Sequence, residues 1–212
     1  NDMSFYKKQS RVALRYCGHI NPENIFEYIG CNGYIALGKC ISELSPIEVV
    51  EEIKKWGKWY LETTNVDGFR LDAVKHIKSG FMAEWIHEMR KIKKIDCVGE
   101  YWNRDLKALE NYITKTNSSI PLFDVPLHYN LFDASNSNGN YDMARIFDNT
   151  LVKEMPQLAV TFVDNHDTQP GQALQSFISE WFKQSAYSII LLRDQGYPCI
   201  FYGDLYGIEH DN

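Results

Sequence analysis

The sequence predicts an α/β fold of about five βα units around a parallel sheet, and three observations support this class. Segments with strand-like and helix-like patterns alternate from residue 45 to the end of the sequence. Hydrophobic residues make up 44% and charged residues 24% of the chain, a balance that argues against disorder, collagen and coiled coil. A length of 212 residues suits one principal core. Because strands that alternate with helices form right-handed βαβ crossovers, we expect a parallel sheet.

Each expected element follows from its local pattern. Ser45 begins the first helix, with Pro46 in its first turn and Glu48 placed to return a hydrogen bond to the cap. Further helices are expected at residues 81–92, 105–113, 142–149 and 174–193, and strands at residues 66–73, 96–101, 122–127, 159–163 and 198–202. Residues 1–44 lack this rhythm, so we treat them as an irregular segment that precedes a domain of residues 45–212.

Composition argues against several kinds of partner. The formal net charge of −6 does not suit nucleic-acid binding, which needs clustered Lys and Arg. The most apolar stretch, residues 186–192, is far shorter than the ~20 residues of a membrane span. The five cysteines are odd in number and show no CxxC spacing, which argues against a zinc site and a disulfide framework. We therefore expect neither a nucleic-acid nor a membrane partner.

Charged residues occupy the end of the first expected strand. Alternation along this strand places Phe69, Leu71 and Ala73 on one face and Arg70 with Asp72 on the other. The apolar set should meet helices. In a parallel barrel the opposite face points inside, where an Arg and an Asp must pair, and where the carboxyl end of a strand is the usual active-site position. An inert ion pair is the alternative interpretation of this strand alone.

Two later strands end in the same way. Glu100 closes the strand at 96–101, and the run Asp164-Asn165-His166-Asp167 follows the strand at 159–163. Three strands thus deliver carboxylates to one edge of the sheet. Glycosidic cleavage needs one carboxylate as nucleophile and a second as general acid. The pattern therefore indicates a glycosidase.

Three longer segments carry a resemblance to a known family. They are GFRLDAVKH at residues 68–76, GEYW at 99–102 and FVDNHD at 162–167, and FDVPLHY at 123–129 and FYGD at 201–204 flank them. In order and spacing these segments resemble the signature regions of the α-amylase family, glycoside hydrolase family 13, and the bacterial liquefying and cytoplasmic α-amylases in particular. The resemblance implies a partial (β/α)8 TIM barrel that hydrolyses internal α-1,4 bonds of starch with retention, in a family that contains calcium.

The resemblance also implies roles for single residues. Asp72 looks like the nucleophile, Glu100 like the acid/base, and Asp167 like the carboxylate that stabilises the transition state. The implied substrate-binding residues are Arg70, which orients the nucleophile, His166, which binds sugar in the cleavage subsite, and Lys75, His76 and Trp102 on the leaving-group side.

The sequence departs from the family pattern in its first part. The matched segments correspond to the family's fourth to eighth strands, so the first three strands have no counterpart. Residues 1–44 would correspond to the tail of the inserted domain B, with a poor match. Where the family has calcium-binding aspartates, residues 39–45 read KCISELS. The backbone carbonyl of His76 is then the one expected calcium ligand, and we expect calcium to matter little.

The favoured function is a starch-cleaving α-amylase acting on an α-glucan polysaccharide or oligosaccharide. Two alternatives stay open: a branching or transglycosylating relative, and a noncatalytic glucan-binding remnant. The open edges at residues 66–73 and 198–202 predict self-association and weak or no activity. No basic and apolar leader opens the sequence, which favours a cytoplasmic location, although the chain begins at Asn1 without Met and an extracellular location stays open.

Overall fold

The structure is a computed structural model that describes residues 15–207, and the chain divides into two compact units at Lys55 and Trp56. The first unit contains the helices α2 (Ile25–Gly30) and α3 (Ile35–Ser42) and the start of α4 (Pro46–Thr64). Its residues 15–44 were expected to be irregular, and the two helices correct that expectation. Residues 1–14 of this segment lie outside the described residues.

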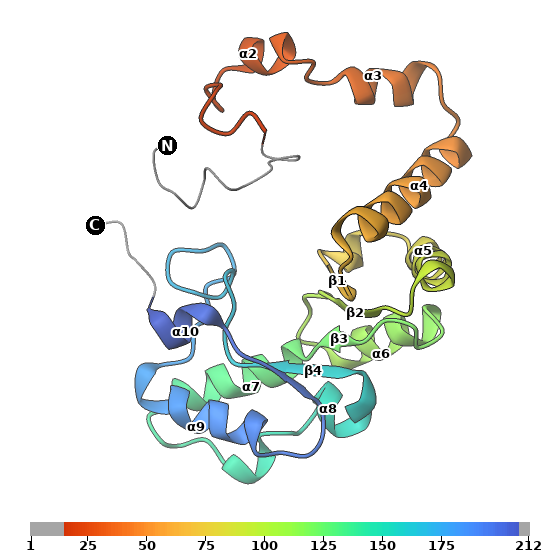
Figure 1. The fold of residues 1–212 in the computed structure, drawn as a ribbon. Coiled ribbons are helices and arrows are strands. Elements are labelled where there is room, and N and C mark those ends of the chain that lie inside the picture. Colours follow the sequence, from red (N-terminus) through yellow and green to blue (C-terminus); the bar gives the residue numbers. More distant parts are fainter. Residues whose placement is uncertain (1–14, 208–212) are drawn as a thin grey trace. The chain divides into compact units, whose positions relative to one another are not determined.

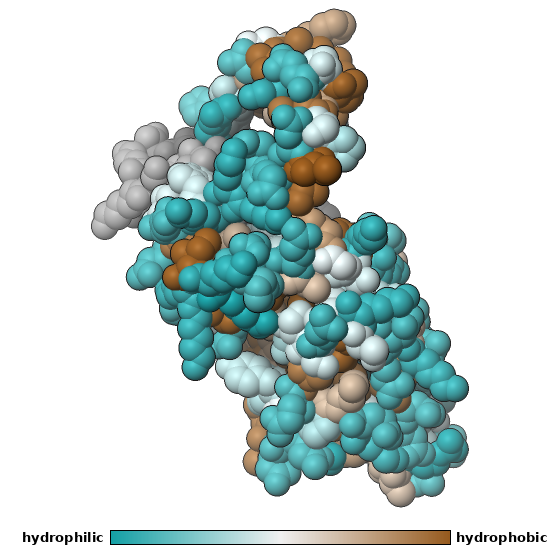
Figure 2. Space-filling view, turned by 90° about the vertical axis from the view of Figure 1, so that its right-hand side faces the viewer, coloured by the Kyte–Doolittle hydropathy of each residue, from teal (hydrophilic) through white to brown (hydrophobic). Residues whose placement is uncertain are grey.

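The helices of the first unit bury little. Neither α2 nor α3 contains a buried residue, and Phe26, Ile35 and Ile41 are all largely exposed. Apolar side chains are accordingly visible at the surface of the α2–α3 region, at the top of Figure 2. The expected cap of α4 is confirmed, since the Glu48 carboxylate accepts the Ser45 N–H at 2.8 Å. This bond lowers the pKa of Glu48.

The second unit is built on the five-stranded parallel sheet that the sequence predicts. The strands follow one another in space in chain order: β1 (Gly68–Leu71), β2 (Asp96–Gly99), β3 (Leu122–Phe123), β4 (Ala159–Phe162) and β5 (Tyr197–Cys199). Figure 1 shows the helices that connect them. These are α5 (Ser79–Ile92), α6 (Leu106–Lys115), α7 (Val125–Ser135), α8 (Leu151–Glu154) and α9 (Glu180–Leu191), with 3-10 turns η1 (Val74–His76), η2 (Met143–Arg145) and η3 (Pro156–Leu158), and α10 (Tyr202–Tyr206) follows β5.

The core of this unit lies between the sheet and the helices. The ring of Phe69 on β1 packs 5.9 Å from Tyr60 on α4 and 5.2 Å from Trp85 on α5, measured between ring centroids. The apolar face of β1 therefore meets helices, as alternation along the strand predicts. Within residues 15–207, no helix has both the length and the apolar character that a membrane crossing requires.

Several predicted boundaries were wrong, and each has a local cause. The strand predicted at 122–127 ends at Phe123, because the Asp124 side chain accepts the N–H of Leu127 and caps α7, with Pro126 in the first turn, where no N–H is needed. The helix predicted at 142–149 is reduced to the turn η2. The strand predicted at 198–202 ends at Cys199, and α10 follows.

The helix predicted at 174–193 begins only at Glu180. The N–H of Ser176 donates to the Thr168 carbonyl at 3.0 Å, and the N–H of Ile178 donates to the Asp164 carboxylate. Because the loop after β4 uses these donors, residues 174–179 cannot join the helix.

Asp124 ties two helices to the sheet. Its carboxylate is fully buried and accepts three backbone N–H groups, from Leu127 on α7 and from Leu151 and Val152 on α8. Burial nonetheless raises the pKa of Asp124 to about 6. The three bonds fix where α7 and α8 start relative to β3.

The two ends of the sheet should make the chain self-associate. Among the described strands, β1 pairs only with β2 and β5 only with β4, and Tyr197 on β5 is 74% exposed. Unpaired edges recruit further strands. Light scattering should therefore detect oligomers, which Tyr197→Lys reduces, whereas the control Met143→Lys at another exposed apolar position does not. A clean monomer of the wild-type chain would contradict this prediction.

Candidate active site

The predicted catalytic carboxylates lie at the carboxyl ends of β1 and β2, joined by one arginine. Arg70 Nη2 lies 2.9 Å from Glu100 Oε1, and Arg70 Nη1 donates to Asp72 Oδ1. The Asp72 side chain is 73% exposed, whereas that of Glu100 is 8% exposed. Two carboxylates in contrasting surroundings therefore share one guanidinium, which holds them close together.

The backbone turns sharply to place these groups. β1 ends at Leu71, and Ala73 adopts a left-handed conformation with φ of 45°, which costs a non-glycine residue about 1 to 3 kcal/mol. The Ala73 N–H donates to Glu100 Oε2 at 3.2 Å, and the Val74 N–H donates to the Glu100 carbonyl at 3.0 Å. These two bonds hold the side chain and the backbone carbonyl of Glu100.

Glu100 Oε1 has an unusual environment. This oxygen is buried and, among the described residues, accepts no hydrogen bond, because the contact with Arg70 lacks hydrogen-bond geometry. A buried carboxyl oxygen without a hydrogen bond is costly for stability. Such an atom is commonly found where a ligand or a reacting group completes the set of partners.

The predicted leaving-group residues gather beside the two carboxylates. Lys75 Nζ donates to the Trp102 carbonyl at 3.1 Å, and Trp102 Nε1 donates to the Tyr129 hydroxyl at 3.2 Å. His76 is exposed at the end of the same turn η1. The structure thus links Lys75 and Trp102 directly and keeps His76 close to Lys75 in the chain.

The remaining predicted residues follow β4, at the same end of the sheet. His166 Nε2 lies 3.3 Å from Asp167 Oδ2, and Asn165 Oδ1 accepts the Asp167 N–H at 2.9 Å. Among residues 15–207, no hydrogen bond or ion pair joins Asp167 to Asp72 or Glu100. Because β3 lies between β2 and β4, the strand that carries Asp167 is not a neighbour of the strands that carry Asp72 and Glu100.

Most of the chain matches a known protein family. A family profile described as "Alpha amylase, catalytic domain" matches residues 44–211, which is most of the chain. The chain belongs to the α-amylase family. It is 58% identical over 167 residues to an α-amylase of Geobacillus stearothermophilus and 47% identical over 166 residues to the cytoplasmic α-amylase of Escherichia coli K12, covering 78% and 77% of the chain.

The amylase likeness covers only part of these relatives. The chain spans 30% of the Geobacillus protein and 34% of the E. coli protein. A solved α-amylase from H. orenii aligns with a TM-score of 0.56 at 22% identity, over 79% of this chain and 36% of that one. This alignment supports the partial barrel fold, in agreement with the five parallel strands.

A second, shorter sequence likeness is to a protein outside the α-amylase family. A stretch of 51 residues, 24% of the chain, is 47% identical to the NADP-reducing hydrogenase subunit HndC of Solidesulfovibrio fructosivorans and covers 10% of that protein. The amylase profile leaves residues 1–43 unmatched, and the first compact unit ends at Lys55. The likeness to the hydrogenase subunit, at 51 residues, is similar in length to the 43 residues that precede the amylase profile.

The described residues do not fit the calcium site expected for an α-amylase. No group of three or more His, Cys, Asp or Glu side chains comes together among residues 15–207. In the segment 39–45, where the resemblance places calcium ligands, the single carboxylate is Glu43. The His76 carbonyl alone cannot hold a cation that prefers six to eight oxygen ligands. We therefore derive no chemical step through calcium.

His128 is a site residue to which the sequence analysis assigned no role. It is fully buried in this amylase-family chain, where Nδ1 donates to the Val163 carbonyl at 2.6 Å and Nε2 accepts the Ser176 hydroxyl at 2.9 Å. Its ring stacks on Phe162 at 5.1 Å and lies 5.7 Å from Trp102. The buried His128 ring therefore packs against the ring of Trp102. The available signal was a histidine in the run FDVPLHY, between apolar and aromatic residues.

Burial lowers the pKa of His128 to about 4, and stability should depend on pH accordingly. Below its usual pKa near 6.5 the unfolded chain takes up a proton that the folded chain refuses, so stability falls as pH falls. Between pH 7.5 and 5, urea titration should show the wild type losing about 2 kcal/mol more than His128→Gln. The exposed-site control His87→Gln should follow the wild type. Parallel curves for wild type and His128→Gln would contradict the prediction.

Proposed function

We propose that this chain carries the catalytic carboxylates of a retaining α-glucan hydrolase, with internal α-1,4 bonds of starch and related glucans as substrate. The observation that carries the proposal is Arg70 held between exposed Asp72 and buried Glu100. Retaining glycosidases divide the work between two carboxylates in different surroundings. The likeness to the Geobacillus α-amylase supports the substrate class.

In the first step, an Asp72 oxygen attacks the anomeric carbon while Glu100 gives its proton to the glycosidic oxygen. The bond between that carbon and oxygen breaks, and the leaving sugar departs with the proton. Arg70 pairs with Asp72 Oδ1 and so orients the nucleophile.

In the second step, Glu100 takes a proton from water, and the water oxygen attacks the anomeric carbon and releases Asp72. Two inversions give net retention. Asp167 stabilises the positive charge that develops on the sugar ring. The substrate is held by sugar-binding side chains: Arg70, Lys75, His76, Trp102 and His166.

A second candidate function is a noncatalytic glucan-binding protein. It is favoured by the exposure of Asp72 and by the single neighbour of each outer strand among the described residues. Water that reaches the reacting groups weakens electrostatic stabilisation of the transition state. A branching or transglycosylating relative would use the same carboxylates and differ at its acceptor site.

Release of reducing ends from soluble starch separates these functions. We expect weak hydrolysis by the wild type and none by Asp72→Asn, because an amide cannot form the glycosyl bond. Asp67→Asn is the matched control, since Asp67 is exposed and pairs with Lys93 outside the site. Equal rates for wild type and Asp72→Asn would remove Asp72 from the mechanism. Glucan binding without cleavage by the wild type would favour the noncatalytic function.

We propose a cytoplasmic location, supported by the 47% identity to the cytoplasmic α-amylase of E. coli. The likeness to proteins of E. coli and Geobacillus also supports a bacterial origin and a role in starch degradation.

We expect calcium to contribute little to stability. A ligand stabilises a fold in proportion to the logarithm of its free concentration over its dissociation constant, and residues 39–45 supply one carboxylate. Added calcium at millimolar concentration should raise Tm by less than ~2 °C. A large increase that EDTA reverses would show that other residues form a calcium site.

For residues 1–44, we propose two origins: the tail of the inserted domain B, as the resemblance implies, or a segment like that of the hydrogenase subunit. The second origin would account for the 51-residue likeness to that subunit. The amylase profile begins only at residue 44. A segment of the second origin would take no part in glucan binding.

Hydrogen exchange in the full chain separates the two origins. Maltotriose should slow exchange in peptides that cover residues 68–76 and 99–102, and for the second origin it should leave peptides from residues 15–44 unchanged. Protection of residues 15–44 by maltotriose would favour the domain B interpretation.

A further inference from the structure

The turn that carries His166 and Asp167 is held by side chains on its buried side. Asn165 Oδ1 accepts the N–H groups of Asp167 and Thr168, each at 2.9 Å. The Thr168 hydroxyl accepts the Asn165 N–H at 2.9 Å and donates to Asp164 Oδ1 at 3.1 Å. Thr168 is fully buried, whereas the His166 side chain is 61% exposed. The positions of His166 and Asp167 are therefore fixed by hydrogen bonds on the buried side of the turn.

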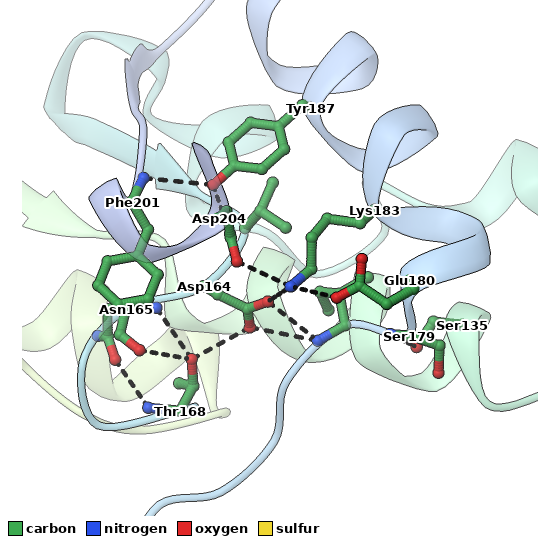
Figure 3. A network of polar contacts seen from close by, with 12 residues as sticks. Ser135, Asp164, Asn165, Thr168, Ser179, Glu180, Lys183, Tyr187, Phe201 and Asp204 are labelled. Carbon is green, nitrogen blue, oxygen red and sulfur yellow. Dashed lines mark hydrogen bonds and ion pairs between the residues drawn. The ribbon is translucent and has the colours of Figure 1, made fainter. Parts of the chain in front are cut away.

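Asp164 is the anchor of this turn and is itself buried, with 2% of its side chain exposed. The sequence analysis placed it in the carboxylate cluster at the strand end, but its carboxylate accepts the Ile178 N–H and pairs with Lys183 Nζ at 3.3 Å. Figure 3 shows this arrangement, with Lys183 reaching from α9 toward the end of β4. A buried carboxylate needs such a cation.

One ammonium group serves two buried carboxylates. Lys183 Nζ also lies 2.7 Å from Asp204 Oδ1, whose side chain is 1% exposed, and the Tyr187 hydroxyl donates to Asp204 Oδ2 at 2.6 Å. Although burial works against the charged form, the bond to Asp204 and the two carboxylates raise the pKa of Lys183. Burial and the Asp204 carboxylate raise the pKa of Asp164 to about 6. Lys183 thus links α9, β4 and the segment after β5.

We propose that Lys183 is a positioning residue, which fixes the turn bearing His166 and Asp167 through Asp164 and Thr168. This inference rests on the proposed function, in which Asp167 stabilises the transition state. Lys183 is not a catalytic residue, because its ion-pair partners in the described chain are Asp164, Asp204 and exposed Glu180. Without this charge Asp164 would keep only its hydrogen bonds from Ile178 and Thr168, so the turn would be held less tightly.

The test uses hydrogen exchange of the full chain, which requires no substrate. In Lys183→Met, a peptide covering residues 164–169 should exchange about tenfold faster, while one covering residues 68–71 on β1 keeps its rate. Lys183→Arg should restore slow exchange, because a guanidinium can also bridge two carboxylates. Lys153→Met, at an exposed ion pair with Asp148, is the control and should match the wild type.

A second variant, Thr168→Val, allows the proposal to be tested even if Lys183→Met does not fold. Thr168→Val keeps the shape of the side chain but removes the link to Asp164, so exchange in residues 164–169 should again rise while β1 is unaffected. Thr114→Val, at an exposed threonine of α6, is its control. Unchanged exchange in 164–169, or equal acceleration in β1, for folded Lys183→Met and Thr168→Val would overturn the proposal.

Kinetics on soluble starch adds a readout that a merely structural role would not give. Where the wild type cleaves starch, both variants should lower kcat about tenfold, since Asp167 acts on the transition state, and should raise KM by a smaller factor, since His166 holds the sugar. A loss that resides in KM alone, with kcat unchanged, would overturn the positioning role. If the wild type neither binds maltotriose nor cleaves starch, the proposed function fails, and the exchange rates alone decide the role of Lys183.

Discussion

The site depends on one shared cation, the guanidinium of Arg70. Two carboxylates at the ends of neighbouring strands would repel one another, and Glu100 is buried where repulsion is least screened. Arg70 compensates both charges from the strand that carries Asp72. The register of β1 and β2, which pairs Arg70 with Val98 and Leu71 with Gly99, brings Glu100 level with the turn after β1. Strand pairing and charge compensation therefore act together.

Beneath this edge of the sheet lies a layer of buried polar groups that accounts for much of the local architecture. Asp124 fixes the starts of α7 and α8, His128 joins β4 to the loop before α9 and supports Trp102, and Asp164 with Lys183 holds the turn after β4. Each group is hydrogen-bonded or paired, as burial demands. The side chains proposed to bind sugar thus rest on groups that solvent does not reach.

The sequence predicted the features that depend on a local residue pattern. It did not predict helix boundaries and buried contacts that depend on residues far away in the chain. The alternation of strand and helix patterns from residue 45 onward correctly predicted the parallel sheet, and the alternation along residues 68–73 correctly predicted the pairing of Arg70 with Asp72. The helix expected from residue 174 failed because Asp164, ten residues or more away, takes the Ile178 N–H. α7 was missed although its cap is local, since the Asp124 side chain accepts the Leu127 N–H and Pro126 stands in the first turn. Lys183 gave no sequence signal, since one lysine on a helix resembles any surface lysine.

The central claim is that Asp72 forms a covalent bond to the sugar, and mass spectrometry can test it directly. A fluorinated α-glucosyl fluoride reacts at a glycosidase nucleophile, and its ring fluorine slows release, so one turnover accumulates as an adduct even where catalysis is weak. The account predicts one glycosyl group per folded chain, attached to the peptide that contains Asp72 and absent from Asp72→Asn. A folded chain that acquires no adduct, or carries it on another carboxylate such as Glu100 or Asp167, would contradict the account.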